Sequence, residues 1–127
     1  MTSPSDRRYT KEHLWVQKTA EGEWLAGITD YAQDLLGDIV YLDPPKVGTT
    51  IESTTPCGIV ESVKTGSDLH APMDGVVTSI NEALVNEPEE INDAPYKAWI
   101  FKFEPTNPDD MAHLMDAEAY EALIAEA

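Results

Sequence analysis

The sequence predicts a mainly β fold of two similar halves, with peripheral helices. Three observations support this class: short apolar runs are separated by turn residues, two β segments repeat at a fixed spacing, and the tail changes to an alanine- and glutamate-rich pattern. The chain has 127 residues, of which 42% are hydrophobic. This length and composition suit a single domain with its own core.

An N-terminal β-hairpin and a short helix are predicted first. The run LWVQKTAEGEWLAGI, residues 14–28, places two apolar segments on either side of a turn that contains Gly22. The run TDYAQDLLG then predicts a helix over residues 30–36. Thr29 or Asp30 can cap the start of this helix, and Leu35 and Leu36 supply its buried side. Gly37 suits the left-handed position after the helix end.

The middle of the chain predicts a series of strands. DIVYL is stopped by prolines, and the segments GIVESV, SDLHAP and GVVTSI are separated by the turns KTG and PMDG. Residues 82–96, EALVNEPEEINDAPY, are acidic and irregular, which predicts a long loop. AWIFKF at residues 98–103 predicts a last strand with Trp99, Phe101 and Phe103 on one face.

The two ends of the chain differ from this β region. Residues 1–8 are polar and are predicted to be a flexible N-terminus, followed by a single domain over residues 9–127. Residues 107–127 form its helical extension, in which Asn107 offers a cap and Pro108 takes the first helical position. Three apolar residues at helical spacing are expected to dock the last helix on the body: Tyr120, Leu123 and Ile124.

A faint internal repeat relates two segments that lie 38 residues apart. The matched positions are Gly37, Ile39, Val40, Leu42, Asp43 and Val47 in one copy, and Gly75, Val77, Thr78, Ile80, Asn81 and Val85 in the other. Two copies are too few for a solenoid, in which several units must stack. The repeat therefore favours one compact β domain built from two similar halves.

The formal net charge of −16 restricts the partners that we expect. Nucleic acids and anionic membranes are bound by basic patches, so neither is expected as a partner. The charge serves either solubility or the electrostatic choice of a basic protein partner. The single cysteine, Cys57, excludes an intrachain disulfide and is expected to be a small buried hydrophobe. The start of the chain lacks a signal-peptide pattern, which predicts the bacterial cytoplasm.

The sequence carries no catalytic or metal-binding motif that we recognise. His13, His70 and His113 lie far apart with no cysteine or carboxylate at metal-ligand spacing, so no metal site is predicted. There is no glycine-rich phosphate loop, and no Ser-His-Asp arrangement can be identified. These observations leave the chain without an identifiable catalytic or metal site.

Lys64 occupies the bend between two predicted strands, in the stretch GIVESVKTGSDLHAP at residues 58–72. The segment from Val63 to Gly66 fits a type I turn, which favours glycine at its fourth position. Lys64 is also the one Lys or Arg between Lys46 and Lys97. An outward amine on a hairpin is a poor general base but an accessible substrate for a modifying enzyme. The residues alone leave two readings open, a solvated charge and a modification site.

Longer stretches of the sequence closely resemble the H-protein family of the glycine cleavage system. They are YTKEHLW, GITDYAQDLLGDIVYLDPPKVG, GIVESVKTGSDLHAPMDG, INEALVNEPEEIN and LMDAEAYEALIAE, which together run from about Tyr9 to the C-terminus. The resemblance implies a lipoyl-domain fold, a barrel-sandwich hybrid of two similar sheets. It also implies that lipoate is attached through an amide to Lys64, and that the protein is a carrier.

The resemblance further implies a set of partners and their tasks. Glycine decarboxylase loads an aminomethyl group on the lipoyl sulfur, aminomethyltransferase passes its carbon to tetrahydrofolate, and dihydrolipoamide dehydrogenase reoxidises the dithiol. A lipoate-attaching enzyme is expected to recognise the hairpin, and we expect the carrier to be a monomer. The residues implied in positioning the hairpin or in that recognition are Glu61, Ser62, Val63 and Asp68.

The sequence departs from the family pattern at three places, of which the first two lie where the resemblance implies the wall of the cleft that holds the loaded arm, and the third is expected to be a tolerated surface change. Leu14 stands where the family has a glutamate that contacts the loaded amine, and the spacer in INDAPYKAWIF is one residue short before Trp99. His70 stands where an aromatic residue is common. The cleft candidates are His13, Leu14 and Asp30. We expect that lipoate attachment is retained while holding of the arm is weakened or altered.

Three other functions are considered beside the glycine-cleavage carrier. A lipoate relay, or a carrier in another pathway, is modestly favoured by Leu14 and by the short spacer. A biotin carrier is disfavoured because Val63 and Thr65 flank the lysine where biotinyl domains typically have methionines. The last is an unmodified scaffold that only binds partners.

Overall fold

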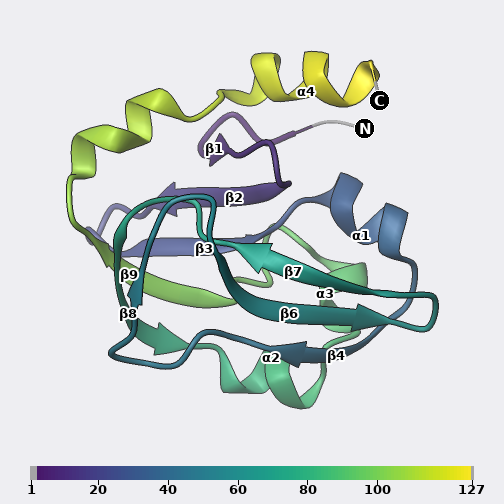
Figure 1. Ribbon diagram of the computed structural model, residues 1–127. Coiled ribbons are helices and arrows are strands. Elements are labelled where there is room, and N and C mark those ends of the chain that lie inside the picture. Colours follow the sequence, from purple (N-terminus) through teal and green to yellow (C-terminus); the bar gives the residue numbers. More distant parts are fainter. Residues whose placement is uncertain (1–2, 127) are drawn as a thin grey trace.

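The computed structural model describes residues 3–126, which form nine strands in two antiparallel sheets (Figure 1). The six-stranded sheet has the order β1-β2-β3-β9-β8-β5, and the three-stranded sheet has the order β4-β6-β7. The strands are β1 (Arg8–Tyr9), β2 (Leu14–Lys18), β3 (Trp24–Ile28), β4 (Ile39–Asp43), β5 (Thr50–Ile51), β6 (Pro56–Ser62), β7 (Gly66–His70), β8 (Gly75–Ile80) and β9 (Phe101–Pro105). The helices are α1 (Asp30–Leu36), α2 (Glu82–Asn86), α3 (Glu90–Asp93), the 3-10 helix η1 (Pro108–His113) and α4 (Ala117–Ala125). The predicted mainly β class with peripheral helices is confirmed.

The main core lies between the two sheets. In β2, Leu14 and Val16 point into this core, whereas Trp15 between them points to the opposite face. The three-stranded sheet contributes Ile39, Leu42, Val60 and Leu69. The predicted hairpin at 14–28 is confirmed, because β2 pairs with β3 over its whole length. The two repeat copies form β4 and β8, which are strands of different sheets.

Helix α4 covers the outer face of the larger sheet beside β1 and β2 (Figure 1). A second cluster forms there from Tyr9, Trp15 and Tyr120, each at most 1% exposed. The rings of Tyr9 and Tyr120 stack with their centroids 4.8 Å apart. The predicted docking of the last helix is therefore confirmed, and Leu123 and Ile124 pack against the same cluster. The predicted cap at Asn107 and the helical start at Pro108 are also confirmed.

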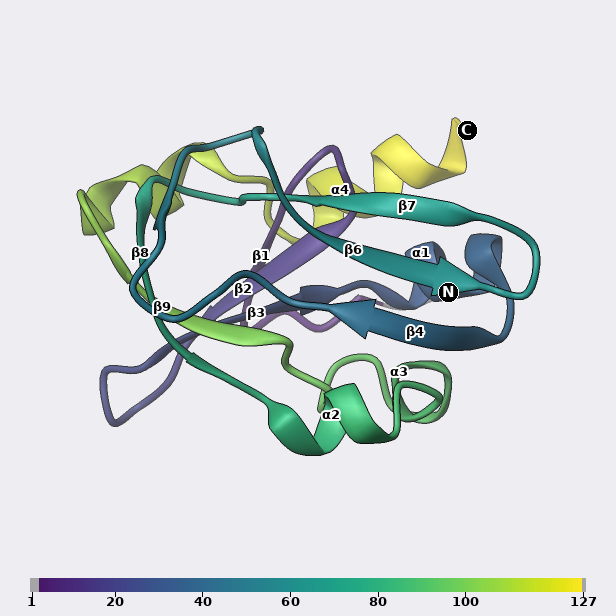
Figure 2. The ribbon, with the colours of Figure 1, turned by 60° about the horizontal axis from the view of Figure 1, so that its bottom comes forward.

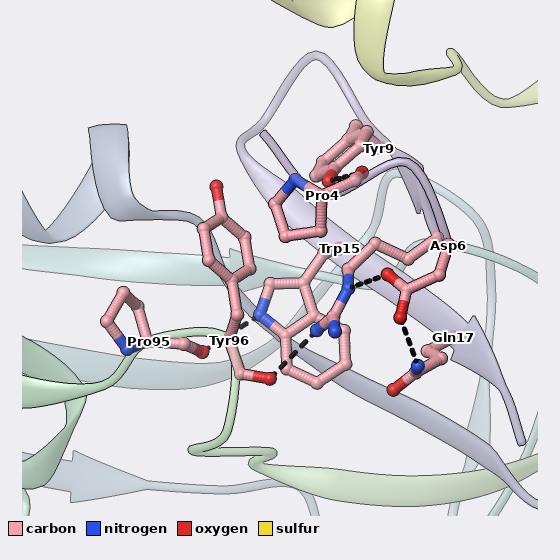
Figure 3. A network of polar contacts seen from close by, with 8 residues as sticks. Pro4, Asp6, Tyr9, Trp15, Gln17, Pro95 and Tyr96 are labelled. Carbon is pink, nitrogen blue, oxygen red and sulfur yellow. Dashed lines mark hydrogen bonds and ion pairs between the residues drawn. The ribbon is translucent and has the colours of Figure 1, made fainter. Parts of the chain in front are cut away.

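The N-terminal segment lies against the body over its described part, residues 3–8. The side chain of Arg7 is 8% exposed and stacks on the Trp15 ring at 4.6 Å. It pairs with Asp6, and one of its terminal nitrogens donates to the carbonyl of Tyr96 at 2.8 Å. Figure 3 shows this network, in which the indole of Trp15 also donates to the carbonyl of Pro95. Residues 3–8 are therefore packed against the domain that was expected to begin at residue 9.

The prediction of a long loop at residues 82–96 is wrong, because this region contains α2 and α3. Each helix is anchored by one apolar side chain, Leu84 at 1% exposed and Ile91 at 0%. One apolar residue in a helix of one turn gives no periodicity, so the sequence pattern could not reveal these helices.

Two predicted faces are also corrected. The helix over residues 30–36 and its cap at Thr29 are confirmed, but Leu35 is 58% exposed, and Ala32 and Leu36 instead pack toward the core. Trp99 precedes β9 and packs with the second cluster, whereas Phe101 and Phe103 face the main core. In α1, packing against the core decides which side is buried, and local periodicity does not encode it. Trp99 lies outside β9, so the alternation of the strand does not apply to it.

Candidate functional site

Lys64 lies in the bend between β6 and β7, which pair in antiparallel register up to Glu61 opposite Gly66. Ser62 closes the bend: its backbone N–H donates to the carbonyl of Thr65 at 2.8 Å. Its hydroxyl oxygen also accepts from the N–H groups of Lys64 and Thr65, at 3.2 Å each. The type I turn predicted at 63–66 is therefore displaced, since Gly66 already belongs to β7. The predicted bend itself is confirmed.

The tip of the hairpin rests on the connection between α1 and β4. Both ribbon views place the bend beside this connection at one end of the molecule (Figures 1 and 2). The N–H of Val63 donates to the carbonyl of Asp38 at 3.0 Å, and Ser62 pairs with Ile39. The bend is thus held by contacts with Asp38 and Ile39 and does not project freely into solvent.

The side chain of Lys64 is exposed and lies along Gly37. A Cβ atom at Gly37 would be 3.1 Å from Cε and 3.5 Å from Nζ of Lys64. Gly37 has φ 84° and ψ −156°, a backbone region that is essentially restricted to glycine. The ion pairs found within residues 3–126 leave the Lys64 amine unpaired. The amine is therefore accessible, and the aliphatic part of the Lys64 side chain packs along Gly37 at the end of α1.

The four residues expected to guide a modifying enzyme lie on or beside the hairpin that carries Lys64, with different exposure. Glu61 and Asp68 are exposed on the outer face of the three-stranded sheet, and Val63 is 67% exposed beside the lysine. Ser62 is 9% exposed and serves the bend from inside. The exposed side chains among these four are thus two carboxylates and one apolar group on the hairpin that carries Lys64.

A cavity of about 120 Å³ lies beneath α1, lined on one side by Ala32, Leu35 and Leu36. The opposite walls come from residues that precede and begin β2, from the end of β3, and from β6 and β7, namely Glu12, His13, Leu14, Ile28, Val60, Ser67, Asp68 and Leu69. Two of the three cleft candidates, His13 and Leu14, therefore line one cavity. Asp30 is not part of its lining: its carboxylate accepts from the Gln33 amide, and its N–H donates to the hydroxyl of Tyr96.

A chain of polar contacts connects this cavity to α4. Nδ1 of His13 lies 2.8 Å from the hydroxyl of Tyr120, which lies 2.7 Å from the hydroxyl of Thr29. The Thr29 hydroxyl caps α1 by accepting from the N–H of Ala32. Burial raises the pKa of Tyr120 to about 12, so this hydroxyl stays protonated. The sequence placed Tyr120 only as an apolar docking residue, because nothing local links it to His13.

The environment of His13 predicts a pH effect on stability. Burial lowers the pKa of His13 below its ordinary value of 6.5, and the opposing effect of Glu12 is smaller. The unfolded chain therefore binds a proton on this histidine at a higher pH than the folded chain does. Acidification from about pH 7 downward through 6.5 should then reduce the free energy of unfolding.

We expect an NMR titration of the His13 ring to give a midpoint below 6.5, and urea unfolding to show that His13→Gln flattens the pH dependence. The matched control is His113→Gln, because the His113 side chain is 83% exposed. A His13 midpoint at or above 6.5 would contradict the prediction.

Other features of the described residues bear on the excluded functions. Within residues 3–126 no group of three or more His, Cys, Asp or Glu side chains is arranged to hold a metal ion. No helix in that part of the chain has the length and apolarity needed to cross a membrane. Cys57 is partly buried against the main core, and burial raises the pKa of its thiol to about 11. It is therefore a packed thiol, as predicted, and not a reactive thiolate.

Comparison with known proteins decides the family. The sequence profile described as Glycine cleavage H-protein matches residues 7–127. The chain belongs to this family. It is 61% identical over 124 residues to the glycine cleavage system H protein of Methylobacillus flagellatus, covering 98% of this chain and 99% of the relative. It is 46% identical to the protein of the same description from Cronobacter sakazakii, covering 95% of each.

A solved structure agrees with this assignment. The crystal structure of a glycine cleavage system H protein from Mycobacterium marinum superposes with a TM-score of 0.88 at 36% identity, covering 97% of this chain and 99% of that one. The predicted lipoyl-domain barrel-sandwich fold is therefore confirmed. The family is the lipoyl-bearing shuttle of the glycine cleavage system, and the predicted function of this chain as that shuttle is confirmed.

Proposed function

We propose that lipoate is joined to Lys64 as an amide, and that this arm carries the aminomethyl group between the enzymes of glycine cleavage. The observation that carries the proposal is the position of the Lys64 amine, exposed at a bend that is fixed by Ser62 and supported at Asp38. When attached, lipoate supplies a dithiolane that accepts the aminomethyl group and is reduced as it does so. Acylation removes the charge of Lys64 and leaves a long neutral arm.

We propose that the loaded arm folds back along α1 into the cavity beneath it. Lys64 starts over Gly37, at the C-terminal end of α1, and the seven residues of α1 span about 10 Å. A lysine–lipoyl chain attached at Lys64 would have to cover about this distance to reach the cavity wall. The wall is largely apolar, which suits the hydrocarbon part of the arm and keeps water from the loaded group. Leu14 gives this wall no hydrogen-bond acceptor for an amine.

The proposed partners are glycine decarboxylase, aminomethyltransferase, dihydrolipoamide dehydrogenase and a lipoate-attaching enzyme. In this role the chain is a non-catalytic carrier, and the partners supply the catalytic groups. Glu61, Asp68 and Val63 are proposed to form the surface that the attaching enzyme recognises. A monomer in the bacterial cytoplasm is part of the same proposal, supported by the bacterial origin of the relatives.

Intact-mass measurement of the protein from its own cells tests the attachment. We expect a mass increase of one lipoyl group, carried by the proteolytic fragment that contains Lys64. An unmodified chain from cells that lipoylate their other carriers would contradict the proposal. A biotinyl increase would indicate the disfavoured biotin carrier.

A second candidate is a lipoate relay to other complexes, which Leu14 and the short spacer before Trp99 favour modestly. Reconstitution separates the two functions. Glycine-dependent release of carbon dioxide with the three partner enzymes supports the shuttle. Transfer of lipoate to another carrier, without glycine turnover, supports the relay.

A further inference from the structure

Asn92 of α3 makes three side-chain hydrogen bonds, with α1, with the connection that leaves it and with the first residue of β4. Its Oδ1 accepts from the N–H of Ile39 at 2.9 Å. Its Nδ2 donates to the carbonyl of Gly37 and to the side-chain oxygen of Gln33, both at 2.9 Å. The acceptor and both donor hydrogens of this amide are thus used within one short stretch of chain.

The stretch that Asn92 holds is the surface on which the hairpin tip rests. Gly37 borders the stem of Lys64, Asp38 accepts the bond from Val63, and Ile39 pairs with Ser62. Residues 37–39 are therefore held between Asn92 on one side and the bend on the other. Ile91, at 0% exposed, anchors α3 in the core, so Asn92 is fixed relative to the sheets.

We propose that Asn92 is a positioning residue for Lys64, which orients the amine by fixing the support at residues 37–39. The inference rests on the proposed function, in which Lys64 is the attachment point. Without these bonds the carbonyl of Gly37 and the N–H of Ile39 lose their partners, and the connection relaxes toward solvent. The bond from Val63 to Asp38 then weakens, and the amine samples orientations that an attaching enzyme does not accept.

The test compares Asn92→Ala with Asn86→Ala, a matched control because Asn86 is exposed at the end of the neighbouring helix α2. Hydrogen exchange of the Ile39 and Val63 amides should become at least about tenfold faster in Asn92→Ala, while amides of the β2–β3 pairing stay unchanged. The rate constant kcat/KM for lipoylation by a lipoate-attaching enzyme should fall about three- to tenfold, mainly through KM. Asn86→Ala should match the parent protein in both measurements.

The near-isosteric Asn92→Asp keeps the test decisive if Asn92→Ala does not fold. The carboxylate still accepts from Ile39 but repels the oxygens of Gly37 and Gln33. We expect Ile39 to stay protected and Val63 to lose protection.

Three results would overturn the inference: parent-like exchange and lipoylation in Asn92→Ala, faster exchange spread evenly over the molecule, or unchanged Val63 protection in Asn92→Asp. Failure of the proposed function is distinguishable, because the parent protein itself would then not be lipoylated.

Discussion

Lys64→Arg is expected to eliminate lipoyl attachment and all carrier activity in glycine cleavage. Arginine keeps the positive charge, but its guanidinium is a poor nucleophile for acylation and cannot form the lysine amide. Because the Lys64 side chain is exposed and the bend is held by backbone groups and Ser62, the free energy of unfolding should change by less than about 0.5 kcal/mol. Intact mass, glycine-dependent release of carbon dioxide and urea unfolding measure the three quantities.

The matched control for this variant is Lys46→Arg, which changes another exposed lysine in the same way. It should leave both the lipoyl increase and the turnover unchanged. Residual lipoylation of Lys64→Arg would mean that a different amine carries the arm, and the proposed site would then be wrong. Loss of stability in Lys64→Arg would mean that the bend depends on the amine itself.

Leu14→Glu is expected to have the second largest effect, because it places a carboxylate at this position of the cavity wall at the cost of stability. Leu14 is 1% exposed and belongs to the main core, so a carboxylate there is desolvated. The free energy of unfolding should fall by about 2–4 kcal/mol. If the carboxylate meets the loaded amine, the lifetime of the aminomethyl arm should lengthen several-fold. Urea unfolding and the hydrolysis rate of the loaded arm measure these effects.

The pH dependence of Leu14→Glu gives a further check. Burial raises the pKa of the new carboxyl above its unfolded value of about 4.3. The penalty from its charge is therefore absent below that pH and develops as pH rises toward the folded pKa. The stability difference from the parent protein should be smaller at pH 4 than at pH 7.

Leu14→Gln is the control, because its amide accepts a hydrogen bond without carrying a charge. Its stability loss should not depend on pH. Equal arm lifetimes in the parent protein and in Leu14→Glu would remove Leu14 from the account of arm protection.

The position of Lys64 shows which part of the candidate site could be predicted from the sequence. Two strand-like runs around a short polar break predict a bend, and the bend was confirmed, because alternation and turn chemistry are local properties of the chain. The same local logic predicted the hairpin at 14–28 and a helix cap at Thr29 or Asp30, of which the structure shows Thr29. The sequence did not predict that Ser62 closes the bend, because this role depends on its hydroxyl accepting hydrogen bonds from the N–H groups of Lys64 and Thr65.

The neighbours of Lys64 were decided by tertiary structure. Gly37 lies under the lysine stem only because β4 pairs with β6, and Asn92 reaches the same connection only because Ile91 is buried in the core. His13 and Tyr120 meet because α4 returns across the larger sheet. Such contacts join segments that are distant in the sequence, and no periodicity within either segment records them.

The sequence by itself determined the mainly β class, most strand segments, the caps before α1 and η1 and the presence of a lone lysine in a bend, and its long motifs indicated the family. Only the tertiary structure decided that residues 82–96 are helical, that Leu35 faces solvent, and that Leu14 is buried beside a cavity. The reason is physical: backbone preference and capping act between near neighbours, whereas burial is set by the packing of two sheets and the helices laid against them.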